Sequence, residues 1–290
     1  MEVIRKEVEN RILELTGMAH KGTDSEYPKK EPRLFDSQCA ICQVHFDFPV
    51  MMCGGISALL LQMLHPSALA GILDHSNFRE DIFGRLRRTC QFIFTTTFGT
   101  ARDAERLITR IKFIHDRVKG TGPDGLVYTA NDPDLLTWVH VAECSSFMAS
   151  YLRYQRTIFS HERQVQYYRE TASIAAKLGA RNIPTTPEDI ADYLQDKRSQ
   201  LRYDDNTREV AQVLLTAKPP GFLGHQVGRI MTNAGVDLLP CWAQEMIGLR
   251  MGIVQRSITR TSAYMVGKGL RACISNPEHY TRQGMNRPSH

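Results

Sequence analysis

Apolar residues recur every three or four positions over most of this chain. That spacing is typical of helices with one buried face, whereas the alternation typical of a half-buried strand is scarce. The stretch 54–64 is apolar all round, which predicts a central helix buried on every side. The pattern therefore predicts an all-α protein that folds as a single globular helical domain.

Capping signals indicate where the helices begin. Thr100 stands three residues before Asp103, the spacing of an N-cap and its partner in the first turn, and Thr186 begins a similar pattern. Asp132 followed by Pro133 is typical of an N-cap and a first helical residue. We expect helices at 2–16, 54–64, 66–74, 79–98, 101–119, 134–154, 160–178, 188–201, 206–215, 226–234 and 242–266.

The two ends of the chain differ from its middle. Residues 19–37 are polar and rich in Pro and Lys, which indicates an arm or loop, and the tail after residue 276 is polar. No internal repeat or low-complexity linker divides the rest. We therefore divide the chain into an N-terminal helix and arm, 1–44, a helical domain, 45–275, and a loose tail, 276–290.

Composition and charge narrow the class of protein. The net charge of +5 is spread along the chain, whereas a nucleic-acid-binding protein usually has a strongly basic face. Seven cysteines, set mostly in apolar runs, favour free thiols in a reducing compartment over a disulfide framework. The N-terminus lacks an apolar secretory stretch, so we expect a cytoplasmic protein. Gly, Gln, His and Pro interrupt the apolar stretch 48–73, so we expect buried helices and no stable membrane insertion.

One helix face combines cationic and apolar residues. Arg85, Arg88 and Thr89 are spaced i, i+3, i+4 and share this face, which continues to Phe92 and Thr96. A face that is cationic at one end and apolar at the other suits a haem, whose propionates would meet the arginines. The alternative is a solvated basic turn that precedes a buried stretch.

Four histidines are candidates for ligation or proton transfer. His115 lies on or beside the buried stripe of its helix, where it would ligate a haem iron, and His140 lies on a still more apolar helix. Each could instead be a hydrogen-bonded core residue. His65 and His75 flank a short helix, where either could move a proton or simply occupy a turn or cap.

Cysteine spacing raises the question of zinc. Cys39-x-x-Cys42 stands near His45 and Cys53, but a structural zinc site usually needs a second spaced pair, which is missing. No βαβ pattern surrounds the pair, so a thioredoxin-type role is not favoured. The sequence also lacks the motifs of phosphate-binding loops, dinucleotide folds, zinc proteases and serine hydrolases, and a loop typical of thiolate-ligated haem.

The order and spacing of these residues resemble a known family. The chain is similar to the MpaB-type oxygenases, which include the latex-clearing proteins (rubber oxygenases), over about residues 45–265. The residues that carry the resemblance are His65-Pro66, Asp74-His75-Ser76-x-Phe78, Gly84-Arg85-x-x-Arg88-Thr89, Phe98-Gly99-Thr100, His115-x-x-Val118-x-Gly120, Tyr128-x-Ala130-x-Asp132-Pro133, Trp138-Val139-His140 and Leu238-Leu239-Pro240.

The resemblance implies an all-helical fold that encloses one b-type haem. Latex-clearing proteins ligate the iron through a histidine, and His115 stands at the matching position. Their R-x-x-K-T arrangement matches Arg85, Arg88 and Thr89, with arginine in place of the lysine. A guanidinium almost never ligates iron, and no glutamate matches the relatives' distal base before Arg85. The rubber-cleaving mechanism and the polymer substrate are therefore not carried over.

The expected function is that of a haem b-dependent oxygenase that uses O2 on a small apolar, alkene-containing substrate of isoprenoid or polyketide type, for instance in C=C cleavage. Arg85 and Arg88 would neutralise propionates or stabilise bound O2, and Thr89 would hydrogen-bond nearby. His65 or His75 would move a proton. The alternatives are a non-catalytic haem sensor or carrier, a haem-free helical interaction protein, and a metalloprotein with clustered histidines and acids but no porphyrin.

Overall fold

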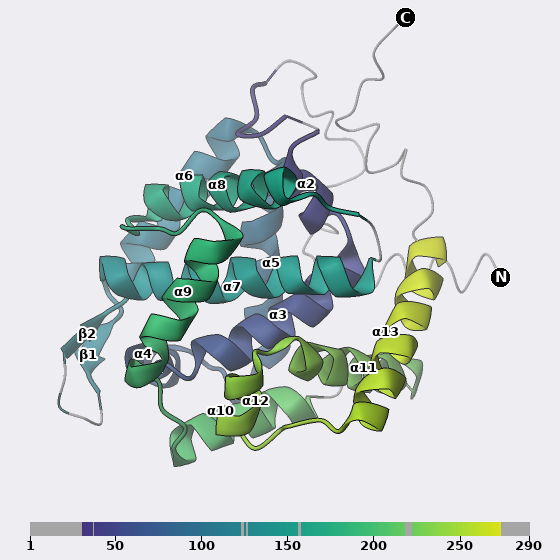
Figure 1. Cartoon of the computed structure of the whole chain (residues 1–290). Coiled ribbons are helices and arrows are strands. Elements are labelled where there is room, and N and C mark those ends of the chain that lie inside the picture. The colour runs from purple at the N-terminus through teal and green to yellow at the C-terminus, as the bar shows by residue number, and fades with distance from the viewer. Residues whose placement is uncertain are drawn as a thin grey trace, which may run out of the picture.

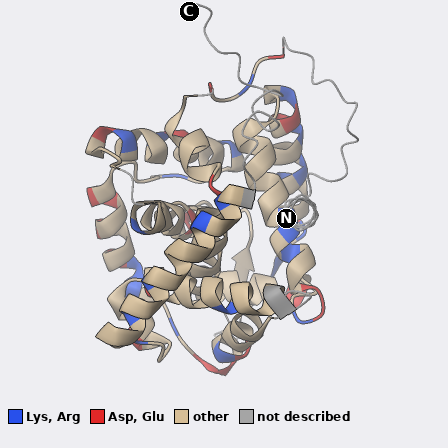
Figure 2. Cartoon of the chain, turned by 90° about the vertical axis from the view of Figure 1, so that its right-hand side faces the viewer, with Lys and Arg blue, Asp and Glu red and all other residues tan. Residues whose placement is uncertain are grey.

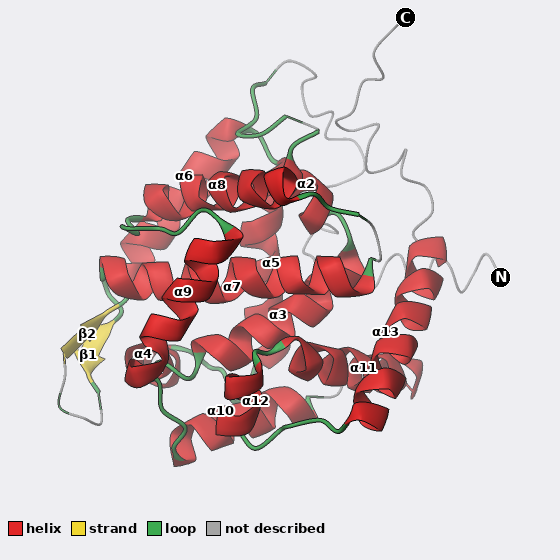
Figure 3. Cartoon of the chain, in the orientation of Figure 1, coloured by secondary structure: helices red, strands yellow, loops and turns green. Residues whose placement is uncertain are grey.

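The computed structural model describes residues 31–36, 38–122, 125, 127–155, 158–217 and 222–273. Figure 3 shows that helices make up most of this part of the chain, with one small hairpin at its edge, which confirms the all-α prediction. The helix expected at 2–16 and the tail at 276–290 lie outside the described residues. The elements are α2 (Ala40–His45), α3 (Phe48–Gln62), α4 (Pro66–His75), α5 (Ile82–Phe98), α6 (Ala101–His115), β1 (Lys119–Thr121), β2 (Val127–Thr129), α7 (Pro133–Tyr154), α8 (His161–Leu178), α9 (Pro187–Lys197), the short 3-10 helix η2 (Arg198–Gln200), α10 (Asp205–Thr216), α11 (Phe222–Leu238), α12 (Cys241–Met246) and α13 (Ile253–Cys273).

Stacked helices form the body of the protein. In Figure 1, α8, α7, α3 and α11 follow one another from top to bottom, and each packs against the next. α13 lies to one side and packs against α11, while α5 pairs with α6 and α2 joins α5 to α8. A large apolar cluster runs through these helices, with Trp138 and Tyr167 fully buried in it.

The most extensive contact joins α3 to α7. A Cβ built on Gly54 of α3 would lie 2.6 Å from Cδ1 and 3.0 Å from Cα of Phe147 on α7. Nearby, Ser150 Oγ donates to Val50 O at 2.8 Å. Because these contacts use glycine and serine, the two backbones approach closely and α3 becomes the buried central helix that its apolar sequence predicts.

The capping predictions are confirmed. Thr100 Oγ1 accepts from Asp103 N at 3.1 Å and begins α6. Asp132 caps α7, with Pro133 as the first helical residue, and Thr186 caps α9. These side chains satisfy backbone N–H groups that have no partner inside the helix.

Two predicted helices end differently in the structure. The helix expected to reach residue 119 stops at His115, and Gly120 instead pairs with Tyr128 in the antiparallel β1–β2 hairpin. The helix expected at 242–266 is divided into α12 and α13. Gly248 lies between them with a φ of +69°, a conformation that ends a helical path and that glycine adopts without strain.

The prediction of free cysteines is wrong at one pair. Cys39 and Cys42 form a disulfide, with their Cα atoms 5.3 Å apart. Cys39 is the N-cap of α2 and Cys42 lies in its first turn, so the helix itself brings the two sulfurs together. Among the cysteines whose side chains the structure describes, the free ones are Cys53, Cys90, Cys144 and Cys241.

Charged residues are distributed widely over the fold. Figure 2 shows Lys and Arg on many helices, interleaved with Asp and Glu. Within the described ranges, no single helix is long and apolar enough to cross a membrane. α3 and α4 reach that length and apolarity only as a pair, and the pair is bent by 104°.

Candidate functional site

His115 is the last residue of α6 and lies beside the turn that leads from β2 into α7. Asn131 holds this turn against α6, because its Nδ2 donates to Lys112 O at 3.2 Å and to Asp116 Oδ1 at 2.6 Å. Burial lowers the pKa of His115, and the Asn131 side chain and the Asp116 carboxylate oppose that effect in part. The net result favours the neutral imidazole, which is the form that binds a metal.

Arg85 lies in the first turn of α5 and is tied to the end of α4. Its Nη1 donates to Ser76 Oγ at 3.2 Å. The adjacent His75 places Nε2 3.2 Å from Lys119 O, just beyond the end of α6. These contacts join the start of α5 and the ends of α4 and α6, so Arg85, His75 and His115 belong to one region of the fold.

Arg88 and Thr89 lie on the outside of α5. Arg88 Nη1 is 3.5 Å from Asp81 Oδ2, and both side chains are more than half exposed. Thr89 is also exposed, and its hydroxyl donates to Arg85 O at 3.2 Å. Burial, and then the positive charge of Arg88, lowers the pKa of Arg85. Of the three residues predicted to share a haem-binding face, Arg85 is therefore half-buried, and Arg88 and Thr89 are exposed.

His65 and His140 both lie near Trp138 of α7. His65 occupies the N-cap position of α4, and its ring centroid is 6.0 Å from that of Trp138. Trp138 Nε1 donates to Gln62 O at 3.3 Å, which fixes the end of α3 against α7. His140 follows two residues later on α7, where burial lowers its pKa to about 4 and keeps the ring neutral.

Glu143 is a candidate that the sequence analysis missed. It stands one helical turn after His140 and therefore shares its face of α7. Burial raises its pKa to about 7, and no described residue hydrogen-bonds to it. Its charge is the second cause, after burial, that raises the pKa of Cys90 on α5 to about 11. An acid three residues after a histidine in an otherwise apolar segment was the available signal.

Three predicted residues carry buried polar atoms without a partner. Arg85 Nε, His115 Nδ1 and His140 Nε2 have no hydrogen bond among the described residues. Buried polar atoms in native proteins almost always have a partner, so Arg85 Nε and His140 Nε2 fit a group that the chain itself does not supply. A haem fits both kinds of nitrogen, since its propionates pair with guanidinium and its iron binds imidazole. Further atoms of this kind are Asn131 Oδ1 and Tyr193 Oη.

The alternative of a porphyrin-free metal centre makes a different geometric prediction. It requires three or more histidines and acids within reach of one ion. In the part of the chain that the structure describes, no group of three His, Cys, Asp or Glu side chains is arranged in this way. A haem needs only one axial protein ligand, so this finding leaves the role predicted for His115 in place.

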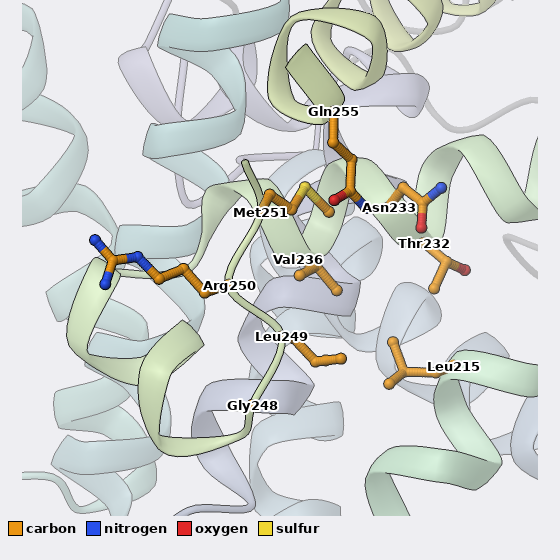
Figure 4. A pocket seen from close by; sticks show the side chains of 9 residues that line it. All are labelled: Leu215, Thr232, Asn233, Val236, Gly248, Leu249, Arg250, Met251 and Gln255. Atoms are coloured by element: carbon orange, nitrogen blue, oxygen red, sulfur yellow. The ribbon is translucent and has the colours of Figure 1, made fainter. Parts of the chain in front are cut away.

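A pocket of about 360 Å³ lies in another part of the fold, between α10, α11 and the start of α13 (Figure 4). In the figure, Arg250 points away from the other side chains that line it. None of the predicted site residues lines this pocket, so it does not account for their unpaired atoms. The lining residues are Leu215, Thr232, Asn233, Val236, Gly248, Leu249, Arg250, Met251 and Gln255.

Comparison with known proteins identifies the family. The family model described as "ER-bound oxygenase mpaB/B'/Rubber oxygenase, catalytic domain" matches residues 42–268. No curated protein and no solved structure matches the chain. The matched region contains every predicted site residue, from His65 to His140. The chain therefore belongs to the mpaB/rubber oxygenase family, and the matched part is the oxygenase catalytic domain of that family.

Proposed function

We propose that this protein is a haem b-dependent oxygenase that uses O2 on a small apolar, alkene-containing substrate of isoprenoid or polyketide type, as in C=C cleavage. The observations that carry the proposal are that Arg85 Nε and His140 Nε2 are buried without a partner and that no described residue hydrogen-bonds to His115 Nε2. Membership in an oxygenase family supports the general activity. The haem and the substrate class rest on the chemistry of these side chains.

His115 and Arg85 would hold the haem. His115 would ligate the iron through Nε2, to which no described residue hydrogen-bonds. Arg85 uses one guanidinium nitrogen on Ser76 and leaves Nε unpaired, so it would bind a propionate. Arg88 and Thr89 are exposed on the same helix, so their predicted contacts with the haem would lie at its solvent edge. When bound, the haem supplies the iron that activates O2.

Residues on α7 would handle protons. With a pKa of about 7, the Glu143 carboxyl can give or take a proton near neutral pH, which suits a general acid or base. The pKa of His140, at about 4, keeps its ring neutral, so its unpaired Nε2 can accept a hydrogen bond or donate one. His65 and His75 remain the other predicted proton carriers.

The apolar surroundings favour an apolar substrate. Trp138 is fully buried beside His65, and Phe92 and Val139 pack against the main apolar cluster. Such walls offer few hydrogen bonds to a polar substrate. Cleavage of a C=C bond by O2 places one oxygen atom in each of two carbonyl products, so the reaction balances without an external reductant.

Absorption spectra test the haem directly. Protein purified from haem-supplemented cells is measured oxidised and dithionite-reduced, beside His115→Ala and a matched control, His161→Ala. His161 is an exposed histidine that contacts Glu188 at 3.1 Å, so its loss should leave the spectrum unchanged. We expect a Soret band in the wild type and in the control, and its loss or a strong shift in His115→Ala. A wild type that stays colourless after titration with hemin contradicts the proposal.

Product analysis distinguishes an oxygenase from a haem carrier or sensor. The haem-loaded protein is incubated with apolar alkenes under ¹⁸O2, with Glu143→Gln as the matched variant. The oxygenase should form carbonyl products that contain ¹⁸O, and Glu143→Gln should lose about 10²–10⁴-fold in rate if the carboxyl acts as acid or base. A stable haem protein that turns over no alkene would support the carrier or sensor instead.

A further inference from the structure

The amide of Asn131 has a fixed orientation at the end of α6. Its Nδ2 donates to two groups that can only accept, Lys112 O at 3.2 Å and Asp116 Oδ1 at 2.6 Å. A flipped amide would set its own oxygen against both acceptors, so the assignment of nitrogen and oxygen follows from the hydrogen bonds. The Oδ1 atom is therefore the free end of this amide, and it is buried without a partner.

The complementary atom belongs to His115. Its Nδ1 is also buried without a partner, and the Asn131 amide is bonded to Lys112 and Asp116, which lie three residues before and one residue after His115 at the end of α6. Asn131 Oδ1 can only accept, so the pair is satisfied only when His115 carries its proton on Nδ1. In that tautomer the lone pair of a neutral imidazole lies on Nε2, the nitrogen that has no hydrogen bond to a described residue.

We propose that Asn131 is a positioning residue for His115: its Oδ1 accepts from Nδ1–H, selects the tautomer, orients the ring and strengthens Nε2 as an iron ligand. The inference rests on the proposed haem site and adds a residue that neither the motifs nor the family match assigns. A partner on the second nitrogen is the usual companion of a metal-binding histidine, and its loss typically weakens metal affinity about 10- to 100-fold.

Four variants distinguish a positioning role of Asn131 toward His115 from a role in which Asn131 only stabilises the turn between β2 and α7. Asn131→Leu removes the acceptor at similar side-chain volume. The double variant Asn131→Asp with Asp116→Asn exchanges amide and carboxylate. It keeps the bond between the two positions and an acceptor for His115, and it gives up the donation to Lys112 O. Thr129→Val is the matched control, because it removes the contact of Asn131 N to Thr129 Oγ1, 3.4 Å long, from the same turn. His115→Gln assigns the histidine signals.

The first measurement uses the haem-free protein. The ¹⁵N shifts of labelled histidines report the tautomer of each ring, and we expect Nδ1–H at His115 in the wild type, in Thr129→Val and in the double variant. Asn131→Leu should shift the population toward Nε2–H. An Nε2–H tautomer in the wild type, or unchanged shifts in folded Asn131→Leu, overturns the inference whether or not the protein binds haem.

The second measurement uses protein loaded with hemin. Asn131→Leu should raise the reduction potential, lower the iron–histidine stretching frequency of the reduced form and speed haem loss about 10- to 100-fold. The double variant should move the potential and the frequency in the opposite directions, and Thr129→Val should match the wild type. Haem binding through His115 with identical spectra in all variants overturns the role of Asn131 alone, whereas a wild type that takes up no hemin overturns the proposed function as well.

Discussion

Adjacent glycines at the α3–α7 contact make a sharp test of how this fold is held together. Gly54 and Gly55 occupy the same turn of the same helix, but only Gly54 faces the backbone of α7. A Cβ on Gly54 would lie 2.6 Å from Phe147 Cδ1, 3.0 Å from its Cα and 3.1 Å from Ser146 O. A Cβ on Gly55 would meet only Phe147 Cε1, at 3.9 Å. We therefore expect Gly54→Ala to destabilise the protein and Gly55→Ala to stabilise it.

The pair of variants isolates the cost of packing. Replacing glycine by alanine inside a helix stabilises it by about 0.8–1 kcal/mol, and this gain is common to both positions. At Gly54 the new methyl group collides with backbone atoms as well as with the ring of Phe147, so rotation of that ring cannot relieve the contact. Such overpacking typically costs about 1–3 kcal/mol. The difference in the free energy of unfolding between the two variants should therefore be about 1–3 kcal/mol.

Urea unfolding followed by circular dichroism measures this difference. The midpoint should fall for Gly54→Ala and rise for Gly55→Ala, with the same dependence on urea concentration in both. For a domain of this size, each 1 kcal/mol corresponds to about 2–4 °C in Tm, so thermal unfolding provides a second measurement. Equal stability of the two variants would refute the close approach of α3 and α7, which fixes the segment of α7 that carries His140.

Two further predictions concern buried charge. Asp237→Ala should destabilise the protein by an amount near the lower end of about 3–5 kcal/mol, because three partly exposed arginines converge on this buried carboxylate. Glu209→Ala removes one partner of an exposed ion pair and should cost less than about 1 kcal/mol. Urea unfolding compares the two variants, and similar losses of stability would contradict the reasoning. Since burial raises the pKa of Glu143 from 4.5 to about 7, its contribution to stability falls as pH rises through that interval, by up to about 3 kcal/mol. Glu143→Gln should therefore be more stable than the wild type at pH 8, with a gap that closes toward pH 4.5, and a gap independent of pH would argue against a buried carboxyl.

Local signals were the ones that could be read from the sequence. Thr100 with Asp103, and Asp132 with Pro133, mark helix starts because each involves atoms only a few residues apart. The end of α6 at His115 was not predictable in this way, because the β1–β2 hairpin that follows it depends on pairing between separated segments. Gly248 divides the last predicted helix through a backbone conformation that the apolar pattern does not encode.

In the candidate site, too, features that depend on neighbouring residues could be predicted and features that depend on distant residues could not. Arg85 and His115 were found because an arginine and a histidine stand out against apolar helical patterns. Asn131 was missed because its role depends on the end of α6, which is distant in sequence. Glu143 was missed because an acid on a helix is ordinarily solvated, and only the packing around α7 shows that this one is half-buried. Contacts between different helices and turns form the site, and the hydrophobic periodicity of the sequence does not predict those contacts.

The exposed position of Arg88 bears on which helix carries the proton chemistry. The latex-clearing proteins, which this chain resembles, have a lysine at the matching position and a glutamate base earlier in the chain. Here Arg88 is solvated and paired with Asp81, and a guanidinium almost never ligates iron or gives up its proton. Glu143 follows His115 in the chain, so it does not match the relatives' base by order, but it supplies the same chemical group from α7. Because burying part of an unpaired carboxyl costs free energy, we propose that acid–base chemistry explains the place of Glu143 better than stability does.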